Sequence, residues 1–481
     1  MKYEANILDA IADKHLFAPW FKDSATWRSW IACLAALFAL PMTREQLDVY
    51  RRCTGRTTPP TQPAQEAWLI CGRRAGKSFI LALCAVFIAC FKDWKPYLAP
   101  GERATVMVIA SDRKQARTIL RYIRAMLTEI PMLAELIEHH TKEGFDLRNG
   151  IRIEVHTASY RSTRGYTIAA ALCDELAFWP TDDAAEPDYE ILTAIKPGMA
   201  TVRGAMLLCA SSPYAQRGSL FEAYRKHFAK DNDPILVWQA STRTMNPTVP
   251  QSLIDEAMER DPASAAAEYN AEFRRDIESL ISIEAVRACI SSGVYERGPQ
   301  PSMFYRAFCD PSGGSVDSMT LAIGHKDYIK QAAVLDAIRE VRAPFSPEDA
   351  VAEFARLLRD YHTTKIEGDH YAGEWAVDRF AKFGIQYELS GKAKSVLYAD
   401  LVQLINSRRI DLLDNGKLIN QLCALERRTA RSGRDSIDHP AGAHDDIANA
   451  VAGVAFSIIN KYGYDHSYAA WQPDFIDYDS R

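Results

Sequence analysis

Short apolar runs alternate with longer segments of helical periodicity between about residue 65 and residue 235. The runs have the length of buried strands and span residues 68–71, 105–110, 151–155, 168–173 and 206–210. Strands separated by helices favour an α/β fold built on a mainly parallel sheet, so we expect one domain over residues 61–235. The apolar anchors Trp20, Trp27 and Trp30 precede it, in residues 1–60, which we expect to form a helical lid or appendage.

The pattern changes after residue 235. Residues 236–298 hold Asn246-Pro247 and two helical stretches, which predict an interdomain segment. Three apolar runs with short joints then follow (304–309, 319–324 and 332–335), and this spacing predicts an antiparallel meander. Together with the helices and strands that follow, they predict a second, mixed α/β domain over residues 299–461. Residues 462–481 form an acidic, aromatic tail.

Composition narrows the class of protein. The 481 residues include 57 Lys and Arg against 62 Asp and Glu, a net charge of −5, which excludes a polybasic protein and requires any nucleic-acid surface to be local. The 10 cysteines are scattered without a C-x-x-C pair, which indicates reduced thiols and neither a disulfide framework nor a zinc site. The longest apolar stretch, residues 30–42, is shorter than the about 18–20 residues that span a bilayer, and we expect no membrane contact.

A strand, a glycine-bounded loop and an apolar helix follow one another over residues 68–90. Phosphates need converging backbone N–H groups, a helix start, a lysine and a hydroxyl for Mg²⁺, and this loop offers all four. We therefore expect ATP to bind here; a turn before a core helix is the structural alternative, and Cys71 stands where the usual motif has its first glycine. The candidate residues are Gly72, Arg73, Arg74, Ala75, Gly76, Lys77 and Ser78.

Paired carboxylates end the apolar run at 168–173. Asp174 is placed to hold Mg²⁺ and Glu175 to activate water beside the phosphate loop. The run at 206–210 ends in Ser211-Ser212, hydroxyls suited to sensing a γ-phosphate. Arg164 is a candidate for neutralising phosphoryl charge, with Arg73 and Arg74 as rivals and a surface ion pair as the alternative.

Separated carboxylates mark a second site. Asp310 ends the first strand of the second domain, Asp369 follows the strand over 364–368, and Asp445 and Asp446 open an apolar helix. Such a cluster needs a cation, and two Mg²⁺ or Mn²⁺ ions would suit phosphodiester cleavage. Each Asp also has a structural alternative as a turn residue or a helix cap.

Basic residues lie near both sites. One group follows a single helix, and another lies just before His444; either could contact a DNA backbone, with a solvated helix face as the alternative for the first. The groups are Arg113, Lys114, Arg117, Arg121 and Arg124, and Arg427, Arg428, Arg431 and Arg434.

The ordered set of these motifs resembles the large terminase subunit of tailed bacteriophages over residues 60–460. The resemblance implies a P-loop (RecA/ASCE-like) ATPase domain followed by a ribonuclease-H-like nuclease. It implies a motor that uses ATP to move double-stranded DNA through a portal protein into a procapsid and that cuts concatemeric DNA. It also implies a homo-oligomeric ring, commonly a pentamer, a small terminase subunit as partner, and action in the host cell cytoplasm.

The same resemblance implies roles for individual residues. Lys77 matches the loop lysine, Ser78 and Asp174 the Mg²⁺ ligands, Glu175 the catalytic carboxylate, and Ser211-Ser212 the coupling motif. Arg164 stands where a trans-acting arginine finger is plausible. Asp310 and Asp369 match nuclease carboxylates, and the third is Asp445 or Asp446, with Asp446 favoured. A helicase or translocase and a catalytically inactive assembly protein are the alternative functions.

Overall fold

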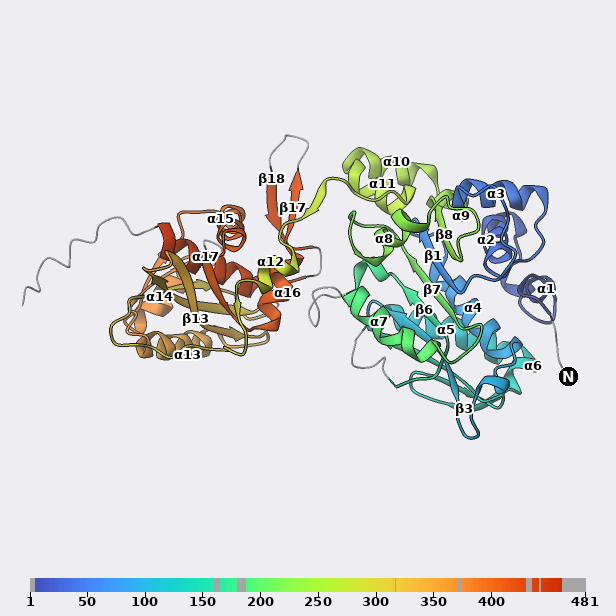
Figure 1. Ribbon diagram of the computed structural model, residues 1–481, viewed down its shortest axis with the longest axis horizontal. Helices are drawn as coiled ribbons and strands as arrows, with labels where there is room; N and C mark the ends of the chain where they lie inside the picture. The colour runs from blue at the N-terminus through green and yellow to red at the C-terminus, as the bar shows by residue number, and fades with distance from the viewer. Residues whose placement is uncertain are drawn as a thin grey trace, which may run out of the picture. The chain divides into compact units, whose positions relative to one another are not determined.

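A computed structural model describes residues 5–158, 165–179, 187–315, 317–369, 373–429, 435–440 and 443–460. The chain divides into two compact units, Met1–Glu278 and Ser279–Arg481 (Figure 1). The sequence predicts five segments, whereas the structure divides once, after Glu278. This division falls within residues 236–298, the predicted interdomain segment. No helix in the described ranges combines the length and the apolar character that crossing a membrane requires.

The first unit is built on an eight-stranded sheet in the order β3-β4-β5-β2-β6-β7-β1-β8. The six strands from β5 to β8 in this order run parallel, and β4 and β3 extend the β5 edge in antiparallel fashion. The predicted α/β class with a mainly parallel sheet is confirmed. The strands are β1 (Glu66–Cys71), β2 (Ala104–Ala110), β3 (Ile137–His140), β4 (Gly144–Leu147), β5 (Ile151–Thr157), β6 (Ile168–Asp174), β7 (Met206–Ser211) and β8 (Ile235–Ala240).

Strand β8 was not expected from the sequence. Its residues pair in parallel with β1, with Cys71 opposite Ala240, so the apolar run that begins at Ile235 adds an edge strand to the sheet. The chain then forms α9 (Thr242–Met245), α10 (Gln251–Arg260) and α11 (Pro262–Asn270) and leaves the unit within β9 (Ile277–Ser279).

Helices cover both faces of this sheet because alternate strand residues face opposite sides. In β1, Leu69 packs in the cluster that holds α2, α3, α4 and α5, whereas Ile70 packs in the cluster that holds residues of α7 and α8. Trp30 of α2 and Tyr50 of α3 are fully buried in the first cluster, so the N-terminal helices are part of the core. The helices are α1 (Ile7–Ala12), α2 (Ser24–Leu37), α3 (Arg44–Thr54), α4 (Lys77–Phe91), α5 (Arg113–Glu129), α6 (Pro131–Ala134), α7 (Pro187–Met199) and α8 (Gly218–His227).

The second unit holds a seven-stranded mixed sheet in the order β10-β16-β13-β12-β11-β14-β15. The three central strands form the predicted antiparallel meander, and the flanking pairs are parallel. The prediction of a second, mixed sheet is confirmed. The strands are β10 (Ile290–Ser291), β11 (Tyr305–Asp310), β12 (Met319–Asp327), β13 (Ala332–Val341), β14 (Lys365–Gly368), β15 (Gln386–Leu389) and β16 (Ile410–Leu413).

Helix α17 lies directly on the centre of this sheet. A Cβ atom at Gly453 would come within 2.3 Å of the Phe308 ring on β11, so glycine permits the close approach of helix and strand. This packing brings the start of α17 to the end of β11. The remaining elements are α12 (Ile283–Arg287), α13 (Pro347–Asp360), α14 (Gly373–Lys382), α15 (Lys394–Asn406), α16 (Gly416–Ala424), α17 (Asp446–Asn460) and the hairpin β17 (Glu426–Thr429) and β18 (Asp435–Asp438).

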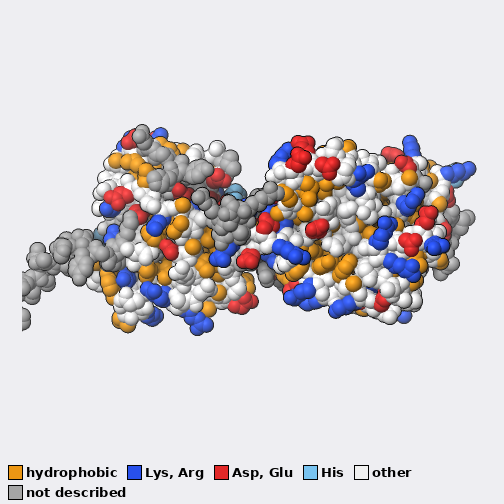
Figure 2. Space-filling model, turned by 90° about the horizontal axis from the view of Figure 1, so that it is seen from above, with side chains coloured by type: hydrophobic (Ala, Val, Ile, Leu, Met, Phe, Trp, Pro, Cys, Tyr) orange, Lys and Arg blue, Asp and Glu red, His pale blue; other side chains and the backbone are white. Residues whose placement is uncertain are grey.

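The surface carries charges of both signs. In the view of Figure 2, Lys and Arg side chains on the first unit are interspersed with Asp and Glu, in keeping with the net charge of −5. All 10 cysteines are free thiols.

Candidate functional site

The loop between β1 and α4 has the shape that phosphate binding needs. Gly76 adopts a φ of 98° directly before α4, a conformation that favours glycine. A Cβ atom at Gly72 would lie 2.3 Å from Thr242 Oγ1, so this position also requires glycine. The first N–H groups of α4 have no partner within the helix and carry the positive end of its dipole. An anion is therefore favoured at this end of α4.

Lys77 is buried at the centre of this site. Its Nζ donates to the carbonyl oxygen of Cys71 at 3.0 Å and to Ser212 Oγ at 2.9 Å, and it lies 3.3 Å from Glu175 Oε1. The lysine that is predicted to meet phosphate thus contacts both the predicted base and the predicted coupling motif.

Ser78 and Asp174 form the second contact of the site. Ser78 Oγ donates to Asp174 Oδ2 at 2.7 Å, and the buried Asp174 Oδ1 has no hydrogen-bond partner among the described residues. Burial, together with the nearby Glu175 carboxylate, raises the pKa of Asp174 to about 7. A buried carboxylate with an unsatisfied oxygen beside a hydroxyl fits Mg²⁺, which prefers oxygen ligands and would keep Asp174 ionised.

Glu175 is held by the end of the neighbouring strand. Its φ of 49° lies in the left-handed region, and its N–H donates to the carbonyl oxygen of Ala210 at 2.8 Å. Its Oε2 accepts from the Ser212 N–H at 3.2 Å and from Ser211 Oγ at 3.3 Å. The ends of parallel strands β1, β6 and β7 therefore bring together Lys77, Ser78, Asp174, Glu175, Ser211 and Ser212.

The arginines predicted near this site differ in placement. The Arg73 guanidinium lies 3.2 Å from Glu268, and 63% of its side chain is exposed. Arg74 is exposed, with a φ of 65°. Arg164 lies outside the described residues, so its predicted role stays a prediction.

The second site joins two of the predicted carboxylates through one amide. Asn449 Nδ2 donates to Asp310 Oδ2 at 2.9 Å and to Asp369 Oδ2 at 3.2 Å, and its own Oδ1 is buried without a partner among the described residues. The end of β11, the residue after β14 and the first turns of α17 meet here. Strand ends and a helix start thus converge as the sequence predicts.

The electrostatics of this cluster favour a cation. Burial, with further repulsion from Asp446 and Asp369, raises the pKa of Asp310 to about 8, although the hydrogen bond from Asn449 opposes the shift. Burial and the neighbouring Asp445 raise the pKa of Asp446 to about 6. Carboxylates that are costly to ionise together, beside an unsatisfied amide oxygen, fit the oxygen-ligand preference of Mg²⁺ or Mn²⁺.

Asp445 is placed differently from Asp446. Its carboxylate lies 2.7 Å from Lys394 Nζ and accepts from the Tyr398 hydroxyl at 2.7 Å, so a side-chain cation already neutralises it. His439 and Asp438 approach the same carboxylate and complete a group with metal-ligand spacing. Of the two carboxylates at the helix start, Asp445 is therefore paired with the Lys394 ammonium, whereas Asp446 repels Asp310 and helps to raise its pKa.

Residues 69–186, about a quarter of the chain, match the family model described as the terminase large subunit, T4likevirus-type, N-terminal. This match confirms the resemblance to large terminase subunits. No curated protein matches the sequence.

Solved structures of terminases are also similar. The large terminase of bacteriophage HK97 is 15% identical with a TM-score of 0.38, over 82% of this chain and 91% of that chain. The large terminase of a thermophilic bacteriophage, in complex with ATP-γ-S, is 10% identical with a TM-score of 0.36, over 82% and 94% of the two chains. The large terminase nuclease of the thermophilic phage G20c with bound magnesium is 18% identical with a TM-score of 0.32, over 37% and 96%.

Two polar residues of the carboxylate cluster in the second unit were not predicted from the sequence. Asn449 lies three residues after Asp446 on the apolar, inward face of α17, and a buried amide at that spacing is the signal that could have found it. Lys394, at the start of α15, gives no such signal, because only the fold brings it to Asp445.

The predicted basic groups lie at the surface where they are described. Arg113, Lys114, Arg117, Arg121 and Arg124 lie along α5, which begins after the carboxyl end of β2, and none of them is buried. Arg427 is exposed on β17, and Arg428 pairs with Glu426 at 3.2 Å. Arg431 and Arg434 lie outside the described residues, as does the tail over 462–481.

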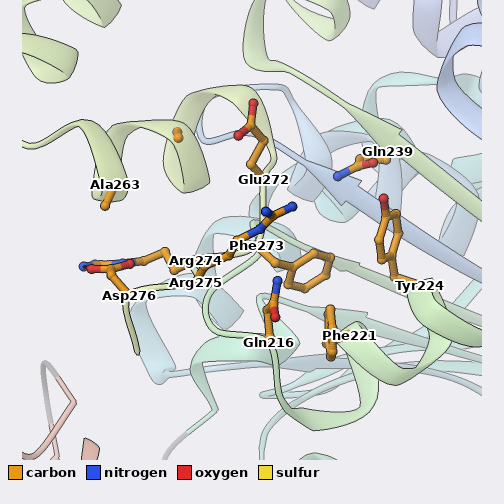
Figure 3. Close-up of a pocket in the computed structure, with 11 residues that line it drawn as sticks. Gln216, Phe221, Tyr224, Gln239, Ala263, Glu272, Phe273, Arg274, Arg275 and Asp276 are labelled. Atoms are coloured by element: carbon orange, nitrogen blue, oxygen red, sulfur yellow. Dashed lines mark hydrogen bonds and ion pairs between the residues drawn. The ribbon is translucent and has the colours of Figure 1, made fainter. Parts of the chain in front are cut away.

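An open pocket of about 490 Å³ lies between α8, α11 and the end of β8. Figure 3 shows the rings of Phe221, Tyr224 and Phe273 gathered on one side. The ring centroid of Phe273 lies 5.0 Å from that of Phe221 and 5.3 Å from that of Tyr224. Arg274 and Asp276 form an ion pair at 2.7 Å on the other side. Helix α11 therefore borders this pocket with one part of its surface and contacts the phosphate loop with another, through its Glu268 carbonyl oxygen.

Proposed function

We propose that this chain is a viral DNA-packaging motor that hydrolyses ATP to move double-stranded DNA into a procapsid and that cuts concatemeric DNA with a metal-dependent nuclease. One observation carries the proposal. Within the segment that matches the terminase family, Lys77 forms an ion pair with Glu175, and Ser78 donates a hydrogen bond to Asp174. The carboxylate cluster of the second unit supports the cutting activity.

In the proposed hydrolysis step, Glu175 orients a water molecule and accepts its proton. Its Oε1 lies 3.3 Å from Lys77 Nζ, which pairs the two charges inside the site. A bound γ-phosphate competes for the Lys77 ammonium, and departure of Lys77 frees Glu175 to act as a base. Ser78 and Asp174 are the residues that would hold Mg²⁺, which supplies charge stabilisation at the phosphates.

The proposed coupling path follows backbone contacts from the site. Ser212 contacts both Lys77 and Glu175, and two residues later the carbonyl oxygen of Tyr214 accepts from the Arg274 N–H at 2.8 Å. The Arg73 N–H donates to the carbonyl oxygen of Glu268 at 2.5 Å. The segment 268–276, which borders the pocket of Figure 3, therefore receives contacts from both loops of the nucleotide site.

In the proposed cutting step, Asp310, Asp369 and Asp446 are the residues that would hold Mg²⁺ or Mn²⁺, ions that activate water and stabilise the leaving oxygen of a phosphodiester. Asn449 keeps the first two carboxylates together before an ion arrives. We propose double-stranded DNA, a portal protein and a small terminase subunit as partners, and a ring of identical chains acting in the host cell cytoplasm.

A helicase is the runner-up function, and the second unit argues against it. A helicase of this class needs a second parallel, phosphate-binding sheet, whereas this unit has an antiparallel meander at its centre. An inactive assembly protein would have no need for the contacts among Lys77, Glu175 and Ser212.

An assay that follows displacement and separation of DNA strands distinguishes these functions. Purified protein with ATP is added to a duplex that carries a triplex-forming oligonucleotide and, separately, to a forked duplex. The proposal predicts DNA-stimulated phosphate release and displacement of the third strand without separation of the duplex. Separation of the forked duplex would instead establish a helicase, and absence of phosphate release under both conditions would refute the motor.

A further inference from the structure

Three consecutive carbonyl groups of the phosphate loop, at residues 73–75, accept hydrogen bonds from side chains outside the loop. Thr242 Oγ1 donates to the oxygen of residue 73 at 2.7 Å. Asn246 Nδ2 donates to the oxygen of residue 74 at 2.9 Å, and Trp30 Nε1 to that of residue 75 at 2.7 Å. The three donors come from two segments that are far from the loop in sequence.

Two donors stand at the ends of one short helix. Thr242 is the first residue of α9, and Asn246 follows its last residue. Helix α9 comes directly after β8, and β8 runs parallel to β1 with Ala240 opposite Cys71. Both segments therefore leave the sheet at the same edge, where the Gly72 N–H also donates to the carbonyl oxygen of Ala240 at 3.1 Å.

The third donor belongs to α2. Trp30 is fully buried, and its neighbour Ser29 donates from Oγ to the carbonyl oxygen of Thr244 in α9 at 2.6 Å. Helices α2 and α9 are thus bonded to each other as well as to the loop. They form one frame around its outer side.

Fixed carbonyl groups also fix N–H groups. In a trans peptide the carbonyl of one residue and the N–H of the next point in opposite directions. Carbonyls held outward at residues 73–75 therefore set the directions of the following N–H groups. The Ala75 N–H donates to the Gly72 carbonyl oxygen at 3.3 Å, and the N–H groups of residues 74 and 76 are the ones that this arrangement would offer to a phosphate oxygen. A loop already in the bound shape loses less conformational entropy on binding.

We propose that Trp30, Thr242 and Asn246 are positioning residues that hold the phosphate loop in its nucleotide-binding shape before nucleotide arrives. This inference rests on the proposed ATPase function. None of the three needs to touch the nucleotide, because each acts through a loop carbonyl.

Two substitutions remove single donors with little change of shape. Thr242→Val exchanges the hydroxyl for a methyl group, and Thr242→Ser is its matched control because it keeps the hydroxyl. Asn246→Asp keeps the Oδ1 that accepts from the Thr248 N–H at 3.2 Å and Oγ1 at 2.6 Å, but loses the Nδ2 donor. Trp30→Phe removes the third donor.

The measurements are the Kd of a fluorescent ATP analogue, the KM and kcat of ATP hydrolysis, and the Tm. Loss of one donor is expected to raise Kd and KM about tenfold. The kcat is expected to stay within about twofold, because saturating nucleotide restores the loop shape. Thr242→Ser is expected to bind like the wild type.

The outcomes separate the inference from the function on which it rests. A fall in kcat and Tm with unchanged Kd and KM would mean that the three residues support only the fold, and would overturn the inference. Unchanged binding in both Asn246→Asp and Thr242→Val would also overturn it, provided that Lys77→Ala abolishes binding. If the wild type and Lys77→Ala bind the analogue equally, or neither binds it, the proposed function itself fails.

Discussion

Replacing Asp310 with asparagine is expected to stabilise the protein when divalent metal is absent, and increasingly so as the pH rises. Asp310 has an ordinary pKa of 3.8 in the unfolded chain and a pKa of about 8 in the folded protein. Because the folded pKa is raised, the folded state keeps the Asp310 proton while the unfolded chain releases it. The stability associated with this group is therefore present below pH 4 and is lost as the pH rises towards 8.

The size of the effect follows from the difference in bound protons. Between the two pKa values the difference approaches one proton, which corresponds to about 1.4 kcal/mol of unfolding free energy per pH unit. For a unit of this size that is roughly 3–5 °C in Tm per pH unit. Asparagine cannot ionise and can still accept a hydrogen bond from Asn449, so it removes this pH dependence and leaves the contact.

The assay is differential scanning calorimetry of the wild type and Asp310→Asn, each in EDTA and in Mn²⁺, between pH 5 and pH 8. In EDTA the variant is expected to be the more stable already at pH 5, because the unfolded wild type has released most of its Asp310 proton there, and increasingly so towards pH 8. In Mn²⁺ the order is expected to reverse, because the wild type gains stability from a bound ion.

A Tm difference in EDTA that does not change with pH would refute the assignment of a strongly raised pKa to Asp310. A failure of Mn²⁺ to stabilise the wild type more than the variant would show that Asp310 holds no ion.

Three further changes test other contacts. Ser78→Ala removes the hydroxyl next to Asp174 and is expected to raise the Mg²⁺ concentration for half-maximal ATP hydrolysis about tenfold, with Ser78→Thr as the control; equal Mg²⁺ curves would contradict the assignment. Asn449→Leu removes the donor that joins Asp310 and Asp369 and is expected to lower the unfolding free energy in EDTA by about 1–3 kcal/mol, measured in urea; an unchanged midpoint would count against this role. The double variant Arg117→Gln, Arg121→Gln is expected to reduce the salt dependence of DNA binding by a slope of about 1.8, and an unaltered slope would exclude α5 from the DNA contact.

The meeting of Lys77, Ser78, Asp174 and Glu175 could be predicted because these residues stand in short stretches of sequence. Lys77 and Ser78 follow one strand by a short loop, Glu175 follows a second strand and Ser211 ends a third, and parallel neighbours place such ends at one edge of the sheet. The same logic predicted that Asp310 and the helix start would meet. The sequence pattern was therefore sufficient to predict contacts between residues that stand at the ends of neighbouring strands.

Other features depend on packing that no local pattern reveals. Asp445 and Asp446 are adjacent at a helix start, and the contacts of Asp445 with Lys394 and Tyr398 distinguish their surroundings. The bond from Trp30 to the loop joins residues 45 positions apart. Such contacts between distant segments decide which of several equivalent polar residues serves a site.

We propose that one chain holds two independent sites, one for ATP and one for DNA cleavage. Phosphate release and plasmid cleavage in Mn²⁺ are measured together for the wild type, Glu175→Gln and Asp310→Ala. We expect Glu175→Gln to lose phosphate release and still cut the plasmid, and Asp310→Ala to lose cutting and still release phosphate. Cutting that persists in Asp310→Ala, or phosphate release that persists in Glu175→Gln, would contradict it.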